Sequence, residues 1–508
     1  MEQKSSIKVC FLLQRRFAYV GHRLAIILKE KYGINRFCAF VSQRSSFEFL
    51  KKQKDINYTS LLLDEDIHEN YKNEVIDWEY LGKIEKEYGV PNLWPYIAID
   101  RVVMSNQLVR EYPYDKSPYA YEEMVKIFQV KAKAIINFFE KEKPNVVFST
   151  VVASISSMLL YYVAKKKGVK FLLSDSTRIK GGCTLTEDYK RYTYVEKEFN
   201  ELMAKRKKSQ KTQEAREFLK EFRSEPTTFL YYSPNELNKS FRLQPLKWLS
   251  PKSVWRTINW FFKLTANYLA GKKRDYTDEK PLGSLIDKIK RKVRTAAGLK
   301  GLYNEVNLDE NFVFFPLHYE PELSLSLFAP FWQNQINLVR QMSVSLPLNF
   351  KLYVKEHPGM VGYRTRSYYK ELKKNPNVKL VNPIVPSYDL IKKARLVLSI
   401  SGTIGWEAVL LKKPVITFGD VFYNKLSFVK KCEKIEELPY LVKSQLENFN
   451  YNEEELELFV AAMLEESADV GLLRIWEKGD ESEETKKKKL TLLADLIARK
   501  ISLKPINC

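Results

Sequence analysis

The sequence predicts an α/β protein built from two doubly wound parallel-sheet domains, with a helical basic insertion between them and helices at the C-terminus. Short apolar runs alternate with helical stretches in both halves of the chain, which is typical of open parallel sheets. The segment between the halves is long, charged and helical in pattern. The 508 residues also exceed what one hydrophobic core usually supports, so two domains are expected.

The first half opens with a strand at residues 7–13, a helix at 21–31 and a strand at 36–41. A second strand, helix and strand follow at 145–150, 156–167 and 169–174. Residues 50–140 contribute helical insertions. We assign residues 1–192 to this N-terminal domain.

Residues 193–305 form the basic insertion. Residues 201–300 hold 24 basic and 10 acidic side chains, and the whole chain has a net charge of +22. An excess of this size predicts an anionic partner surface, either lipid or nucleic acid.

Within the insertion, residues 253–269 place aromatic and aliphatic side chains at helical spacing beside basic ones. One hypothesis is an interfacial helix on an anionic membrane, with Trp255, Trp260, Phe261 and Phe262 at headgroup depth. The other is an ordinary amphipathic helix that packs on its own domain. The sequence leaves both open.

The second half, residues 306–450, alternates strands with helices, and the strands are expected at 311–317, 351–355, 378–381, 396–400 and 414–418. Residues 451–508 are expected to form helices that pack back over the domain junction.

The five cysteines show no metal spacing and no disulfide framework, which favours a reducing compartment. No signal peptide is recognisable, and no stretch of about 18 apolar residues occurs. We therefore expect a cytoplasmic protein, peripheral on the inner face of the membrane.

Polar residues follow three expected strands of the second half, where the carboxyl ends of parallel strands share one edge. The third of these strand ends, at Ser401, Gly402 and Thr403, begins a helix whose N–H groups and dipole suit a phosphate. Glu407 is placed to accept from a ribose. The full set of expected ligand-binding residues is His318, Glu322, Lys355, His357, Arg364, Ser399, Ser401, Gly402, Thr403 and Glu407.

The order of three motifs resembles the bacterial capsule polysaccharide synthesis family, over about residues 311–430 and more weakly near 171–188. The motifs are residues 317–322 (LHYEPE), His357-Pro358, and residues 401–408 (SGTIGWEA) followed by 413–419 (KPVITFG). That family includes capsule Kdo transferases and is more distantly similar to sialyltransferases and polysialyltransferases.

The resemblance implies a GT-B glycosyltransferase with two Rossmann-like domains. The donor nucleotide sugar binds the C-terminal domain, where His357, Ser401 and Thr403 hold its phosphate, and a polysaccharide or glycolipid acceptor binds the N-terminal domain. It implies no metal and no cofactor. The acidic D/E-D/E-G motif of the sialyltransferase relatives is missing here.

The candidates for the catalytic base are therefore Asp100, Asp175, and Glu187 with Asp188. His357 is also expected to take part in catalysis. Asp175 follows an expected parallel strand, although a turn-capping role explains it as well. Arg15 and Arg16 follow the first strand and are expected to meet an anionic acceptor. The Asp64-Glu65-Asp66 run has the spacing of a metal motif, but further acidic residues nearby favour a solvated helix start.

Two other functions compete with transfer. A nucleotide-sugar 2-epimerase of the same fold needs no acceptor and leaves the basic aromatic segment without a role. A non-enzymatic protein that binds a polyanion remains the other alternative, but no nucleic-acid-binding module is recognisable and we expect no nucleic acid partner.

Overall fold

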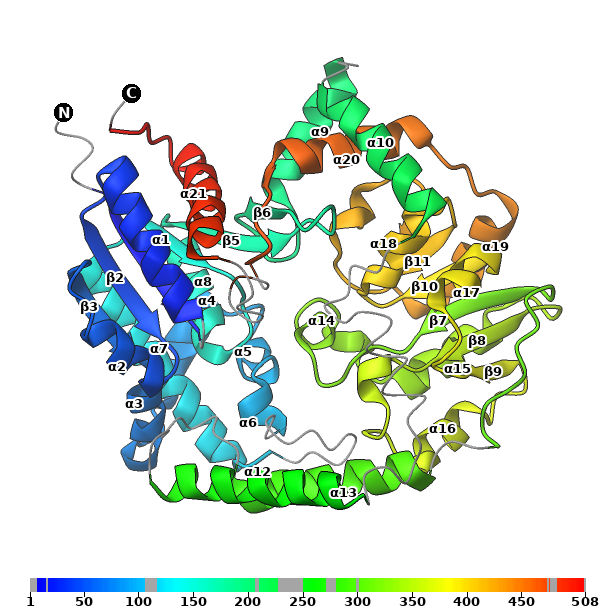
Figure 1. The fold of residues 1–508 in the computed structure, drawn as a ribbon, viewed down its shortest axis with the longest axis horizontal. Helices are drawn as coiled ribbons and strands as arrows, with labels where there is room; N and C mark the ends of the chain where they lie inside the picture. The colour runs from blue at the N-terminus through cyan, green and yellow to red at the C-terminus, as the bar shows by residue number, and fades with distance from the viewer. Residues whose placement is uncertain are drawn as a thin grey trace.

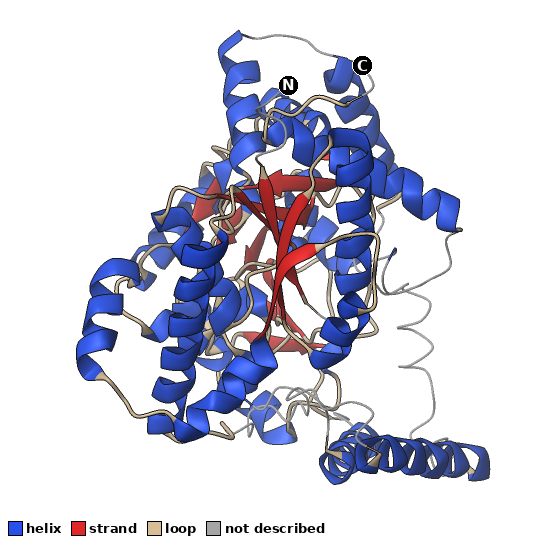
Figure 2. Ribbon diagram, turned by 90° about the vertical axis from the view of Figure 1, so that its left-hand side faces the viewer, coloured by secondary structure: helices blue, strands red, loops and turns tan. Residues whose placement is uncertain are grey.

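A computed structural model describes residues 7–14, 17–105, 117–205, 210–226, 250–270, 280–297, 301–472, 475 and 482–506. Two α/β domains lie side by side in it, and a pair of helices runs beneath both of them (Figure 1). Helices cover both faces of the central strands, as the turned view shows (Figure 2).

The N-terminal sheet has the strand order β13-β6-β5-β4-β1-β2-β3. Its five strands from β5 to β3 are parallel, while β6 and β13 join antiparallel. The runs that form β1, β2 and β4 are almost entirely buried, which explains their apolar sequences. The strands are β1 (Lys8–Leu13), β2 (Arg36–Val41), β3 (Tyr58–Leu63), β4 (Val146–Ser149), β5 (Lys170–Ser176), β6 (Cys183–Thr186) and β13 (Ser467–Ala468).

The helices of this domain include the long α7 and the helix α21, which packs on α1 from the far end of the chain. The strand β3 lies inside the stretch that the sequence pattern assigned to helical insertions. Its side chains are mostly half-buried, because β3 is an edge strand, and its apolar pattern is correspondingly weak. The helices are α1 (Phe17–Tyr32), α2 (Arg44–Lys51), α3 (Asp64–Glu69), η1 (Asn70–Asn73), α4 (Trp78–Tyr88), α5 (Trp94–Ala98), α6 (Arg101–Ser105), α7 (Tyr121–Glu142), α8 (Ile155–Lys166) and α21 (Glu483–Lys500).

The C-terminal sheet is fully parallel, with the order β12-β11-β10-β7-β8-β9. The first strand of each domain, β1 or β7, lies inside its sheet, and the strand order reverses beside it. This is the doubly wound arrangement of Rossmann-like domains, so the predicted fold class, two such domains as in GT-B proteins, is confirmed. The strands are β7 (Phe312–Pro316), β8 (Lys351–Lys355), β9 (Val378–Val381), β10 (Leu396–Ser399), β11 (Val415–Thr417) and β12 (Val429–Lys431).

Two apolar clusters form the faces of this second sheet. One lies toward α18 and contains Trp406 and Phe459, and the other lies toward α15 and α16. The helices of the domain are α14 (Leu323–Ser326), η3 (Pro330–Trp332), α15 (Gln335–Val344), η4 (Pro358–Met360), α16 (Arg366–Leu372), α17 (Ser387–Lys393), α18 (Thr403–Leu410), η5 (Phe422–Lys425), η6 (Ile435–Glu437) and α19 (Leu438–Glu447).

The basic insertion divides into two structural parts. The helices α9 (Thr193–Lys205) and α10 (Gln210–Ser224) pack on α20 (Glu453–Glu465) and share the apolar cluster of the C-terminal domain. The helices α12 (Pro251–Leu269) and α13 (Pro281–Ala297) contact each other and stand apart from the two sheets (Figures 1 and 2).

The chain passes between the domains at two neighbouring places. It leaves the N-terminal domain after β6 and enters α9, and it returns from α20 into β13, which pairs with β6. The Thr184 hydroxyl donates to the Glu466 carbonyl over 2.7 Å at this junction. Both ends of the chain therefore lie at the N-terminal domain (Figure 1).

Candidate functional site

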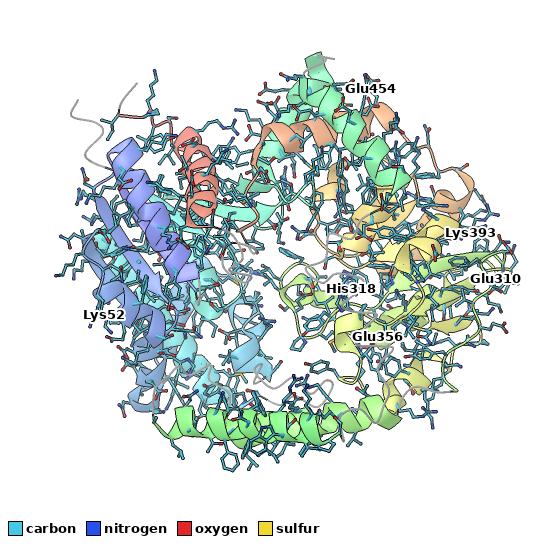
Figure 3. The ribbon with its side chains drawn as sticks, in the orientation of Figure 1. Lys52, Glu310, His318, Glu356, Lys393 and Glu454 are labelled. Atoms are coloured by element: carbon cyan, nitrogen blue, oxygen red, sulfur yellow. The ribbon has the colours of Figure 1, made fainter. Side chains whose placement is uncertain are left out.

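Three polar strand ends meet at the place where the order of the C-terminal sheet reverses. The strands β10, β7 and β8 are adjacent, and each is followed by residues that the sequence pattern selected. Ligands of doubly wound domains bind outside the carboxyl ends of the strands at such a reversal. His318 and Glu356 lie on the side of the C-terminal domain that faces the N-terminal domain (Figure 3).

His318 joins two of these strand ends directly. The backbone N–H of Ser401 donates to its Nε2 over 3.2 Å, so the residue after β7 touches the loop after β10. A side chain at position 402 has no room, because a Cβ on Gly402 would lie 2.9 Å from the same Nε2. Burial lowers the pKa of His318 to about 3, with His357 and Arg364 adding to the shift. The ring is therefore neutral, and its Nε2 accepts.

Arg364 holds the loops after β7 and β8 together and is only 2% exposed. Its guanidinium donates to Glu356 and, over 3.0 Å, to Glu320, and it also donates to the His318 carbonyl over 2.7 Å. The buried guanidinium therefore has protein partners, and its predicted contact with a ligand stays a prediction. The charge of Arg364 is used inside the protein, where it positions His318 and His357.

His357 forms the start of the short helix η4. Its Nδ1 accepts from the Gly359 N–H over 3.1 Å, which leaves Nε2 as the protonated nitrogen of the neutral ring. Burial lowers the pKa of His357 to about 4, and the positive charges of Arg364 and Lys355 contribute. The imidazole thus offers a neutral N–H donor.

The loop after β10 presents the N-terminus of α18. The Ser401 hydroxyl donates to the Ser324 carbonyl over 2.6 Å, and the Ser399 hydroxyl accepts from the Gly402 N–H over 3.1 Å. Both hydroxyls therefore shape the loop. The backbone N–H groups of Thr403 and Ile404 have no acceptor in the part of the chain that the structure describes, as expected for a first helical turn. These two groups are therefore unbonded backbone donors at the start of α18.

Lys355 and Glu407 lie beneath this surface. Lys355 is 5% exposed, and its ammonium donates to the Ser387 hydroxyl over 2.7 Å. Burial lowers the pKa of Lys355 to about 8, although Glu407 and Asp389 oppose the shift. Glu407 is also buried and interacts with Tyr388. The expected ribose contact would therefore require the Glu407 side chain to become exposed.

The buried lysine predicts a pH dependence of stability. Between pH 8 and the ordinary lysine pKa near 10.4, the unfolded chain keeps the Lys355 proton and the folded chain has released it. The free energy of unfolding of the wild type, relative to Lys355→Met, should therefore rise by about 1.5 kcal/mol from pH 8 to pH 9.5. Urea unfolding of both proteins across this range measures the difference, and a flat difference contradicts a depressed pKa.

Glu322 occupies the position before the short helix α14, and its carboxylate accepts from the Ser324 hydroxyl over 2.7 Å. The loop before it approaches the other domain, since the Arg101 guanidinium donates to the Pro321 carbonyl over 3.3 Å. Leu327 joins the apolar cluster of the N-terminal domain. The segment after β7 therefore contacts both domains.

Asp100 has a structural role in this conformation, and its part as a catalytic base stays a prediction. Its carboxylate is buried and accepts from the backbone N–H groups of Val102, Val103 and Ile155 at 3.1 to 3.2 Å. It thereby caps α6 and joins it to the start of α8. A carboxylate fully used in this way is poorly placed to take a proton from an acceptor hydroxyl.

The two explanations of Asp100 predict opposite results for Asp100→Asn. The amide oxygen preserves the cap on Val102 and Val103, so transfer by the folded variant should stay within about threefold of the wild type. Asp100→Ala should lower the free energy of unfolding by about 1–3 kcal/mol, because buried N–H groups lose their acceptor. Loss of transfer in a stably folded Asp100→Asn would restore it as the base.

Asp175 lies within the ladder between β5 and β6, since β5 extends to Ser176. Its side chain is 43% exposed and pairs with Arg178 at 3.2 Å. Glu187 and Asp188 follow β6, and Glu187 accepts from the Tyr194 hydroxyl. Asp175 and Glu187 are similarly exposed, at 43% and 41%, but Asp175 lies near the carboxyl end of the parallel strand β5, whereas Glu187 follows the antiparallel strand β6.

The remaining predicted residues lie away from these strand ends or outside the described part of the chain. Arg15 and Arg16 lie outside the described residues. Asp64 is buried beside Lys131 at 2.5 Å, while Glu65 accepts from the Arg44 N–H and Asp66 pairs with the Arg44 side chain. In the described residues no group of three or more His, Cys, Asp or Glu side chains is arranged to hold a metal ion.

Three supporting residues were not selected from the sequence. The Gln335 side-chain oxygen accepts from the His318 N–H over 2.7 Å, and its amide group donates to the His318 carbonyl over 3.3 Å. Tyr423 donates to the Gly402 carbonyl over 2.8 Å. Ser324 accepts from Ser401 through its backbone. None of the three carries a local sequence signal, because each acts from a distant segment.

Comparisons with known proteins agree with the motif-based resemblance. Residues 273–429 match the family model described as capsule polysaccharide biosynthesis protein. Protein FixF of Sinorhizobium fredii (strain NBRC 101917 / NGR234) is 33% identical over 127 residues, which is 25% of this chain and 30% of FixF. The chain thus spans less than a third of that relative. The predicted family resemblance is confirmed.

Solved structures match the chain at low sequence identity and low TM-score. The beta Kdo 2,7 transferase of Thermosulfurimonas dismutans KpsC shares 13% identity at a TM-score of 0.35, over 77% of this chain and 96% of that one. The UDP-GlcNAc 2-epimerase of Methanocaldococcus jannaschii shares 12% identity at a TM-score of 0.24, over 90% of this chain and 99% of that one. At these values neither structure assigns a function to a residue.

Proposed function

We propose that this chain, whose residues 273–429 match the capsule polysaccharide biosynthesis family, is a glycosyltransferase that uses a nucleotide-sugar donor. The acceptor is a surface polysaccharide or glycolipid, and the reaction takes place at the cytoplasmic face of the membrane. The nucleotide sugar is a substrate, and the proposal includes no metal and no other cofactor.

One observation carries the proposal. His318, His357 and the start of α18 converge where the order of the C-terminal sheet reverses, and His318 bonds to the α18 loop. Free backbone N–H groups at a helix start, beside a histidine N–H, suit a phosphate at the carboxyl edge of a doubly wound sheet.

In this proposal the donor phosphate lies against the N–H groups of Thr403 and Ile404, and the Nε2–H of His357 donates to it. Charge builds on the nucleotide phosphate as the sugar leaves, so donors fixed in advance stabilise the transition state. Arg364 keeps the His318 and His357 loops in register, and it does so without touching the donor.

The acceptor is assigned to the N-terminal domain, whose strand order reverses between β1 and β4, and Arg15 and Arg16 follow β1 in the sequence. Asp175 is the proposed base, which takes the proton of the acceptor hydroxyl. Asp175→Asn should then abolish transfer while nucleotide binding persists, because the donor phosphate groups lie on the other domain.

The experiment incubates the purified protein with a panel of cytidine monophosphate and uridine diphosphate sugars, with and without membrane-derived polysaccharide and glycolipid acceptors. Product formation is followed by mass spectrometry, and parallel samples contain a chelator. Sugar transfer that depends on the acceptor supports the proposal. Absence of both transfer and nucleotide binding contradicts it, and epimerisation of a donor without an acceptor would favour the 2-epimerase alternative.

A further inference from the structure

We infer that α12 and α13 together form a docking surface for an anionic lipid bilayer, with an apolar stripe on each helix inserted at headgroup depth. The two helices contact each other and leave large apolar side chains exposed. No described helix of the chain is both long and apolar enough to cross a bilayer, so contact of this kind would lie in the plane of the membrane.

The helix α13 turns polar side chains toward the protein and apolar side chains away from it. Ser284 and Asp287 are buried against the protein, and Arg291 and Arg294 follow at helical spacing on the same side. The opposite side is exposed and apolar. A helix that packs on its own domain shows the reverse pattern, so this one is built for contact with something outside the chain. The outward residues, between 43% and 65% exposed, are Leu282, Ile286, Ile289 and Val293.

The helix α12 contributes a second outward stripe, and none of its residues is buried. Trp255 and Phe262 are each 67% exposed, and Ile258 and Leu269 continue the stripe. Trp260 and Phe261 differ from the sequence-based expectation. The Lys288 ammonium lies 4.0 Å from the centre of the Trp260 ring, so Trp260 helps to join the two helices, and Phe261 is half-buried.

The charge on the two helices selects the occupant. They hold eight basic side chains and one acidic one, Asp287, which pairs with Arg291. At 100° per residue, Lys290 and Lys292 flank the apolar stripe of α13, while Arg256 and Lys263 lie beside that of α12. Basic side chains beside exposed aromatics fit lipid phosphates above acyl chains. Nucleic acid leaves the aliphatic stripe unexplained, because it offers no apolar layer of that length.

The helix pair is fixed to the C-terminal domain next to the candidate site. Arg294 donates to the Tyr363 carbonyl over 2.7 Å, and the Arg291 guanidinium lies 4.8 Å from the Tyr363 ring centre. Thr295 approaches Gly362 so closely that a Cβ there would lie 2.6 Å from its hydroxyl. Tyr363 precedes Arg364, so docking would hold the site at a fixed orientation to the membrane.

The test is flotation of the purified full chain with vesicles of neutral phosphatidylcholine and with vesicles that also contain phosphatidylglycerol. We expect binding to the mixed vesicles and at least tenfold less to the neutral ones. The double variant Phe262→Ser/Ile289→Ser should lose at least tenfold of the binding. Phe331→Ser is the matched control, because Phe331 is 93% exposed and lies outside the helix pair; it should bind as the wild type does.

Lys263→Glu/Lys290→Glu should weaken binding to mixed vesicles by a similar factor. Circular dichroism and the urea midpoint verify that each variant folds. Equal binding to both vesicle types, no binding to either, or equal losses in the Phe331 control overturns the inference. Competition by duplex DNA with no effect of Phe262→Ser/Ile289→Ser would assign the surface to nucleic acid. None of these measurements uses turnover, so their outcome does not depend on the proposed transferase activity.

Discussion

Replacement of Arg364 by methionine is expected to lower the free energy of unfolding by about 3–5 kcal/mol. The side chain is fully enclosed and supplies the only positive charge seen to contact Glu320 and Glu356 among the described residues. Without it, two carboxylates remain in a buried environment, and the His318 carbonyl loses its donor. Urea unfolding followed by tryptophan fluorescence measures the change.

Arg340→Met is the matched control for this prediction. Arg340 also pairs with a glutamate, Glu371, but its side chain is 47% exposed. An exposed pair contributes about 0–1 kcal/mol, so the control should change stability little. If Arg364→Met costs no more than Arg340→Met, the buried cluster does not hold the loops together. Arg364→Met/Glu320→Gln should recover part of the loss, because one uncompensated charge is then removed.

Replacement of His357 by alanine should reduce transfer by about 10²–10³-fold, in line with the loss of one donor to a developing oxyanion. Nucleotide binding should weaken as well. The free energy of unfolding should change by less than about 1.5 kcal/mol, since the fold loses only the acceptor for the Gly359 N–H. Isothermal titration with nucleotides and turnover assays measure the two effects separately.

His357→Asn separates the two nitrogens of the ring. Asparagine still caps the Gly359 N–H but lacks a group at the position of Nε2. If the outward N–H is the functional one, His357→Asn should be as inactive as His357→Ala and more stable. Activity near that of the wild type in His357→Asn would show that the ring acts only through the Gly359 turn.

The strands of the two sheets were predictable because parallel strands buried on both faces leave continuous apolar runs. The strand-end motifs were predictable for a related reason, since polar residues directly after such runs have few structural uses in the core. His318, His357 and the loop from Ser401 to Thr403 therefore emerged from the sequence, and the structure brings them together at one edge.

The roles of individual charges were not predictable, because they depend on burial and on partners far along the chain. Arg364 has the sequence signature of an anion ligand, yet its partners are glutamates 44 and 8 positions away. Asp100 was a candidate base, and its carboxylate accepts from the backbone N–H groups of α6 and α8. The periodicity of the sequence also cannot tell which side of α13 faces the protein. Only the structure shows that its polar side is buried and its apolar side is exposed.

The double connection between the domains restricts how they can move. The chain crosses twice at one place, after β6 and before β13, and the two crossings are joined by strand pairing and by the bond from Thr184 to Glu466. Two adjacent connections of this kind form a hinge. They permit rotation of one domain relative to the other about a single axis, and they resist sliding and twisting between the domains. Opening and closing of the two domains should therefore follow one angular coordinate. Labels placed across the far edges of the domains should report one correlated distance change when donor binds.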